Sequence, residues 1–213
     1  MRTIVLDLET KKLFEEVEKG DRKALGVSCV GIWDSQLRSF SAKGVTKSKQ
    51  DSGGQAYNDG FRAFMEDELY ELWPILNSAD LIVGFNINGF DMPVLSPYYI
   101  GKIENLPTLD LLDMVKEALG FRLKLDHLAR ATLGYGKNGN GLDACRFYKE
   151  GKLEELKKYC LNDVAVTRDL YLFAKEKGIL KYPDLGDTVK EFKVEIDKFM
   201  PQKADLVQVG LGF

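Results

Sequence analysis

The segment TIVLDLET at residues 3–10 constrains the fold of this chain more than any other. Its first six residues are mostly apolar or β-branched, which predicts a β-strand buried on both faces in a layered sheet. Residues two apart on a strand point to the same face, so Asp7 and Glu9 should lie side by side. Paired carboxylates in a buried strand repel each other and lose hydration, and a bound cation offsets that cost.

Two later segments carry further acidic residues. Asp91 follows an apolar run at 81–85, in LIVGFNINGFDMPVL, and Asp163 lies in KKYCLNDVAVTRDLY within an expected helix at 153–177. Residues four apart share one face of a helix, which places the Tyr159 hydroxyl beside Asp163. The spacing therefore predicts that acids from three segments share a site for two divalent metal ions, Mg²⁺ or Mn²⁺.

Each of these features has a simpler structural explanation when it is taken alone. Acidic residues are common at strand ends, and Asp91, two residues before Pro93, suits the N-cap of a helix. Tyr159 and Asp163 can form an ordinary hydrogen-bonded pair on a helix. The occurrence of all three motifs in one chain is what favours a functional site.

Length and charge limit the function further. The 213 residues, 45% of them hydrophobic, predict a single domain at 1–200 and a tail at 201–213. The net charge of −3 excludes a global positive field, so a polyanionic partner must be held locally. Basic residues outnumber acidic ones between 116 and 158 and could face a phosphate backbone, although a solvated helix surface is the simpler and favoured interpretation of that excess.

The chain shows no sign of a disulfide framework, a zinc site or a membrane anchor. Its three cysteines, Cys29, Cys145 and Cys160, are far apart and form no CxxC motif. The N-terminus lacks an apolar signal core, and no apolar run reaches the length of a membrane span. We therefore expect a cytoplasmic protein with no membrane contact.

Periodicity predicts an α/β fold. The expected strands are at 3–8, 26–33, 37–42 and 81–85, with an edge strand at 189–196. The expected helices are at 61–77, 109–119, 125–133 and 153–177. Residues 43–60 and the segment GYGKNGNG are expected to be loops.

At the three acidic motifs the chain resembles the DEDDy branch of the DnaQ-like 3′–5′ exonucleases, which includes the proofreading domains of family B DNA polymerases. The resemblance covers residues 3–177. The other branch of that superfamily places a histidine five residues before the last aspartate. Here that position is Lys158, whereas Tyr159 occupies the tyrosine position, and the sole histidine, His127, matches no catalytic position. The resemblance implies a ribonuclease H-like fold, with a central mixed β-sheet flanked by α-helices.

The resemblance also implies an activity and a set of site residues. The activity is metal-dependent removal of nucleoside 5′-monophosphates from single-stranded 3′ ends, with DNA preferred over RNA. Four acids would hold the two metal ions, and a tyrosine would orient the attacking water. These catalytic residues are Asp7, Glu9, Asp91, Asp163 and Tyr159. The terminal nucleotide would contact Leu8, Thr10, Asn86 and Phe90. The alternative is a catalytically inactive domain of the same fold that binds nucleic acid or acts as a scaffold.

Overall fold

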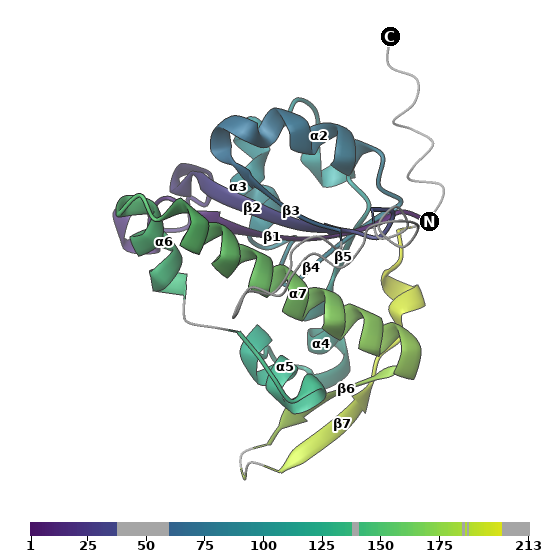
Figure 1. The fold of residues 1–213 in the computed structure, drawn as a ribbon. Coiled ribbons are helices and arrows are strands. Elements are labelled where there is room, and N and C mark those ends of the chain that lie inside the picture. The colour runs from purple at the N-terminus through teal and green to yellow at the C-terminus, as the bar shows by residue number, and fades with distance from the viewer. Residues whose placement is uncertain (38–59, 138–140, 185, 187, 202–213) are drawn as a thin grey trace, which may run out of the picture.

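The computed structural model describes residues 1–37, 60–137, 141–184, 186 and 188–201. Its centre is a five-stranded sheet with the strand order β3-β2-β1-β4-β5 (Figure 1). The strands are β1 (Thr3–Thr10), β2 (Val27–Asp34), β3 (Phe61–Met65), β4 (Leu81–Gly84) and β5 (Thr108–Asp110). β1 is antiparallel to β2 and parallel to β4, so the sheet is mixed. The α/β fold with a central mixed sheet flanked by helices, predicted from the sequence, is confirmed.

Helices cover both faces of this sheet. α2 (Leu69–Asn77) and α3 (Asp91–Leu95) lie on one side, and α4 (Leu111–Leu119), α5 (Leu125–Leu133) and the long α7 (Leu153–Lys177) lie on the other (Figure 1). α6 (Gly141–Lys149) lies beside the N-terminal half of α7 (Figure 1). Short 3₁₀ helices occur at Phe14–Glu16, Lys23–Leu25, Glu66–Glu68, Ser96–Tyr98, Ile103–Asn105 and Ile196–Phe199.

The alternation of side chains along β1 decides which face receives the acids. Ile4, Leu6 and Leu8 pack in the hydrophobic cluster that includes α2 and α3, whereas Val5 packs in the cluster that includes α7. Because side chains on a strand alternate between faces, the odd-numbered acids of β1 share the face of Val5. The apolar pattern of the strand thus directs both carboxylates towards α7.

A glycine on the neighbouring strand lets α7 approach the sheet closely. Gly31 on β2 pairs with Asp7 on β1. A Cβ atom at position 31 would lie 2.9 Å from the Cys160 Sγ and 2.9 Å from the Val164 Cγ2. A larger residue would therefore push α7 away from the sheet at the level of the β1 acids.

The prediction of one helix over 61–77 is wrong in its first part. Phe61–Met65 forms β3, which pairs antiparallel with β2 from Trp33↔Phe61 to Cys29↔Met65, and α2 begins at Leu69. The apolar spacing in this segment fits both the 3.6-residue period of a helix and the two-residue period of a strand. Pairing with β2, a tertiary interaction, selects the strand.

Three other expectations need correction. The helix expected at 109–119 begins at Leu111, because residues 109 and 110 belong to β5 and the Asp110 side chain caps α4. The segment expected at 189–196 is β7 (Val189–Lys193), which among the described strands pairs with β6 (Ile179–Pro183) alone, in a separate two-stranded sheet. In the glycine-rich stretch, residues 134–137 form no helix or strand, as expected of a loop, whereas Gly141 begins α6, which we did not predict.

The remaining expected elements have clear outcomes. The strands expected at 3–8, 26–33 and 81–85 and the helices at 125–133 and 153–177 are present with shifts of one or two residues at most. Leu37 lies in a turn, and the rest of the strand expected at 37–42, the loop at 43–59 and the tail from 202 lie outside the described residues. Within the described part of the chain, no helix combines the length and apolarity that a bilayer crossing requires.

Candidate metal centre

Three acids from two elements meet at one point. One carboxylate oxygen from each of Asp7, Glu9 and Asp163 lies within 4.8 Å of the other two. The first two come from β1, and Asp163 comes from the face of α7 that packs against the sheet. All the donors are oxygens, which is the set that Mg²⁺ and Mn²⁺ prefer. The arrangement fits a divalent metal.

Asp91, the fourth predicted acid, reaches the same cavity from α3. It is the first residue of α3, and the N-cap position is occupied by Phe90. Its Oδ1 accepts a hydrogen bond of 3.1 Å from the backbone N–H of Leu8, the residue between the two acids of β1. The simpler explanation of Asp91 as an N-cap is therefore wrong, and its carboxylate instead links α3 to β1.

Burial of so many carboxylates disfavours their charged forms. Burial, aided by the charge of Asp163, raises the pKa of Asp7 to about 8. Burial and the nearby charge of Asp7 raise the pKa values of Glu9 and Asp91 well above their usual range. Without a metal ion the cluster retains protons at neutral pH, whereas a divalent cation would favour full ionisation.

Tyr159 lies one helical turn before Asp163. Its ring packs 6.5 Å from that of Phe147 on α6, measured between centroids. The hydroxyl is buried and has no hydrogen-bond partner among the described residues. Burial raises the pKa of Tyr159, and the charges of Asp163, Glu9 and Asp7 add to that effect, so the phenol is neutral at physiological pH. A buried hydroxyl without a partner among the described residues needs an explanation, and a bound water is one. Tyr159 itself is not among the residues that line the cavity described below.

Lys137 is a charged residue at this centre that we did not single out from the sequence. Its Nζ lies 2.5 Å from the Asp163 Oδ2 and 5.8 Å from the centroid of the Tyr159 ring. Burial acts to lower the pKa of the ammonium, but the charges of Asp163 and Asp7 outweigh it, and the pKa rises. In the sequence Lys137 is one of ten basic residues between 116 and 158, and no spacing links it to the acids.

The acids open onto a cavity of about 470 Å³. Its polar wall includes Asp7, Glu9, Asp91, Lys137 and Asp163, and its other lining residues include Leu8, Thr10, Phe14, Phe90 and Cys145. The cavity thus combines a charged centre with an apolar wall, as small-molecule sites commonly do.

The predicted substrate-binding residues divide into two groups. Leu8, Thr10 and Phe90 line the cavity. Asn86 is not among the lining residues: it lies in a turn with a φ of 64°, and its Oδ1 accepts a hydrogen bond of 3.0 Å from Arg122. The structure thus brings the first three to the cavity and leaves Asn86 outside its wall.

Phe14 is a further cavity residue that we did not predict. It lies on the 3₁₀ helix that follows β1, and 53% of its surface is exposed. Its ring centroid is 5.8 Å from that of Phe90. The only sequence signal for this residue is an aromatic side chain shortly after the first acidic motif.

Comparison with known proteins assigns the family. A model described as the RNase_H superfamily matches residues 5–174, a range that contains all four acids and Tyr159. The chain belongs to the RNase_H superfamily. Domains of this superfamily are commonly nucleases that use divalent metals, and the acid cluster of this RNase_H-superfamily chain is consistent with that chemistry.

A solved structure of the family B DNA polymerase from the hyperthermophilic archaeon Pyrobaculum calidifontis is similar to this chain. The TM-score is 0.52 at 20% sequence identity, and the match covers 82% of this chain and 24% of the polymerase chain. At that identity the likeness concerns the fold, and it extends over less than a quarter of the polymerase. No curated protein matches the chain.

Proposed function

We propose that this protein is a metal-dependent 3′–5′ exonuclease of the DEDDy type, acting on single-stranded DNA and releasing nucleoside 5′-monophosphates. One observation carries the proposal. The oxygen donors of Asp7, Glu9 and Asp163 converge at an open cavity that Asp91 also lines. The hydroxyl of Tyr159, one helical turn from Asp163, is buried and has no hydrogen-bond partner among the described residues. A scaffold domain without chemistry would have no need for this buried and electrostatically costly set of groups.

The four acids would hold two divalent ions, Mg²⁺ or Mn²⁺. Asp7, Glu9 and Asp163 would bind one ion, and Asp7 with Asp91 would bind the other. Bound ions lower the pKa of an attacking water and stabilise negative charge on the phosphate and the leaving oxygen. The raised pKa values of Asp7, Glu9 and Asp91 support this assignment, because metal binding is the natural way to keep these carboxylates ionised.

Tyr159 would orient the attacking water. The attacking water gives one proton to solvent as its oxygen bonds to the phosphorus of the terminal phosphodiester. The bond from that phosphorus to the 3′ oxygen of the preceding nucleotide breaks, and the leaving oxygen takes a proton from solvent. A neutral phenol can donate a hydrogen bond to the water or accept one from it, and the hydroxyl of Tyr159 has no competing protein partner among the described residues.

The cavity would receive the terminal nucleotide. Leu8, Thr10 and Phe90 would form its wall, and Phe14 would add a second aromatic face on which a base can stack. Asn86 would join this set only after release from Arg122. The volume of about 470 Å³ suits one nucleotide rather than a duplex, and a paired end must first be unstacked.

The decisive experiment uses end-labelled single-stranded and duplex DNA and RNA with Mn²⁺, Mg²⁺ or chelator. We expect a ladder shortened from the 3′ end of single-stranded DNA, nucleoside 5′-monophosphates as products, and no reaction in chelator or with the Asp7→Ala variant. Cleavage of circular single-stranded DNA would identify an endonuclease instead. A folded protein that binds Mn²⁺ and cleaves none of these substrates would favour the inactive scaffold.

A further inference from the structure

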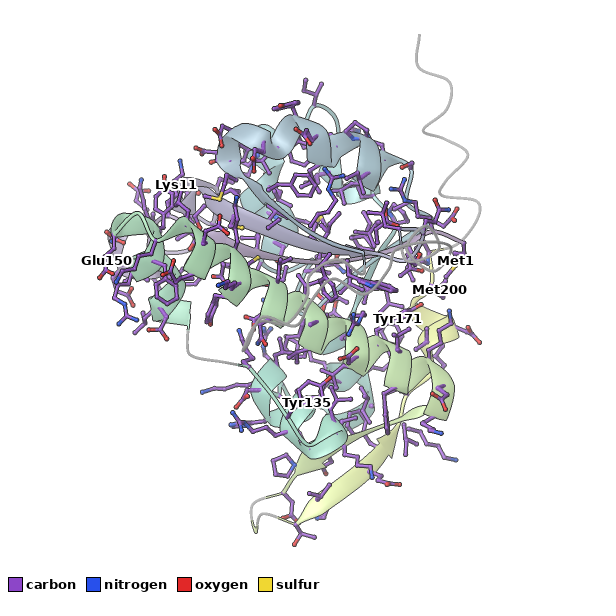
Figure 2. All side chains as sticks on the ribbon, viewed as in Figure 1. Met1, Lys11, Tyr135, Glu150, Tyr171 and Met200 are labelled. Carbon is purple, nitrogen blue, oxygen red and sulfur yellow. The ribbon has the colours of Figure 1, made fainter. Side chains whose placement is uncertain are left out.

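The segment that follows α5 positions Lys137 at the acid cluster. The backbone N–H of Lys137 donates a hydrogen bond of 2.9 Å to the Asp126 Oδ1 on α5. Tyr135 follows α5 by two residues (Figure 2). Its hydroxyl donates a hydrogen bond to Asp169 on α7. A Cβ atom at Gly136 would lie 2.1 Å from the Asp126 Oδ1, so a glycine is needed for this close approach. These contacts hold the backbone of the segment, and the long side chain of Lys137 extends from it to Asp163.

The ammonium of Lys137 and a divalent metal compete for the same oxygens. Asp163 is only 1% exposed, and its Oδ2 lies 2.5 Å from the Lys137 Nζ. The carboxylate belongs to the three-acid cluster, which has the dimensions of a metal site. An ammonium this close to Asp163 also repels any cation that enters the cluster. Lysine pairing and metal binding therefore oppose each other.

We infer that Lys137 is a built-in counter-ion, which a divalent metal displaces from Asp163 and which then binds a phosphate oxygen of the substrate. The second half of this inference rests on the proposed function. Lys137 lines the cavity, and its displaced ammonium would remain there as a positive charge beside the incoming phosphate. Lysine is suited to this exchange because its charge is compact and its stem is flexible.

The first test measures Mn²⁺ binding without substrate, by titration calorimetry, in wild type and in Lys137→Gln. Loss of the competing ammonium should tighten Mn²⁺ binding by about tenfold, because the ion no longer has to displace Lys137 from Asp163. The control is Lys149→Gln, which removes a surface lysine whose Nζ lies 2.8 Å from the Glu16 Oε1 and should change the affinity by less than about twofold. Unchanged or weaker Mn²⁺ binding in Lys137→Gln overturns the displacement.

The second test measures single-turnover cleavage of a single-stranded oligonucleotide at saturating Mn²⁺. Lys137→Gln should be slower by about tenfold, although it binds metal more tightly, because the phosphate loses a charged partner. An unchanged rate overturns the phosphate contact. If wild type binds Mn²⁺ but cleaves nothing, both the proposed function and the phosphate contact are refuted. The calorimetry still tests whether metal displaces Lys137 from Asp163.

A third measurement is made on the wild-type protein, and the conservative variant Lys137→Arg serves only to assign the signal. In wild-type protein carrying ¹³C-labelled lysine, the Cε resonance of Lys137 can be assigned by its absence from Lys137→Arg. Saturating Mg²⁺ should shift this resonance as the ammonium leaves Asp163. A resonance that Mg²⁺ leaves unchanged overturns the displacement even if Lys137→Gln does not fold without metal.

Discussion

Replacing Asp7 with asparagine should stabilise the metal-free protein at high pH. Burial raises the pKa of Asp7 from 3.8 to about 8, so the folded state holds a proton that the unfolded state releases. The stabilising contribution of this proton is complete below pH 4 and is lost as the pH rises through 8. Asparagine has the same shape but no charge, so Asp7→Asn should escape that loss.

The size of the effect follows from the pKa difference. A shift of about four pH units corresponds to about 6 kcal/mol at roughly 1.4 kcal/mol per unit. In chelator at pH 9, Asp7→Asn should therefore have the higher free energy of unfolding, by up to about 6 kcal/mol, whereas at pH 4 the two proteins should agree within about 1 kcal/mol. With saturating Mn²⁺ the order should reverse, because the ion stabilises only a state that can bind it.

Urea unfolding followed by circular dichroism between pH 4 and 9, in chelator and in Mn²⁺, measures these differences. Asp113→Asn is the matched control, because Asp113 lies on α4 with 39% of its side chain exposed and pairs with Lys116. This variant should follow wild type within about 1 kcal/mol under every condition. The reasoning is refuted if Asp7→Asn gains less than about 1 kcal/mol over wild type at pH 9 in chelator, because surface substitutions alone change stability by up to about 0.5 kcal/mol.

Three further variants test other parts of the structure. Tyr159→Phe should slow cleavage by at least about tenfold with Mn²⁺ affinity changed less than about twofold, and an equal rate in single-turnover assays would remove the hydroxyl from the mechanism. Phe14→Ala should raise KM for single-stranded DNA by about fivefold or more at nearly constant kcat, since stacking of a base contributes at least about 1 kcal/mol; an unchanged KM would contradict that contact. Gly31→Ala should cost about 1–3 kcal/mol of stability by overlap with Cys160 and Val164, and an unchanged urea midpoint would show that α7 does not pack as closely as described.

Local sequence patterns predicted the central strand and its acids well. The period of two along β1 depends only on neighbouring residues, and it placed Asp7 and Glu9 on one face. The four-residue spacing in α7 likewise placed Tyr159 beside Asp163. These features are local, so the sequence carries them directly.

The parts that sequence reasoning missed depend on contacts between distant segments. Phe61–Met65 is a strand because it pairs with β2, and its apolar spacing alone did not distinguish a strand from a helix. Lys137 reaches Asp163 through anchors on α5 and α7 that no spacing reveals. Phe14 belongs to the cavity because it faces Phe90, which is 76 positions further along the chain.

The alternation of β1 makes the metal centre and the hydrophobic core dependent on one register. Its even-numbered side chains fill the core beneath α2 and α3, and its odd-numbered positions carry the acids. Deleting a single residue within this strand would exchange the two sets, so that carboxylates entered the core while leucines faced α7. Length changes in β1 should therefore abolish folding and metal binding together, and no compensating change at the cavity could restore either one separately.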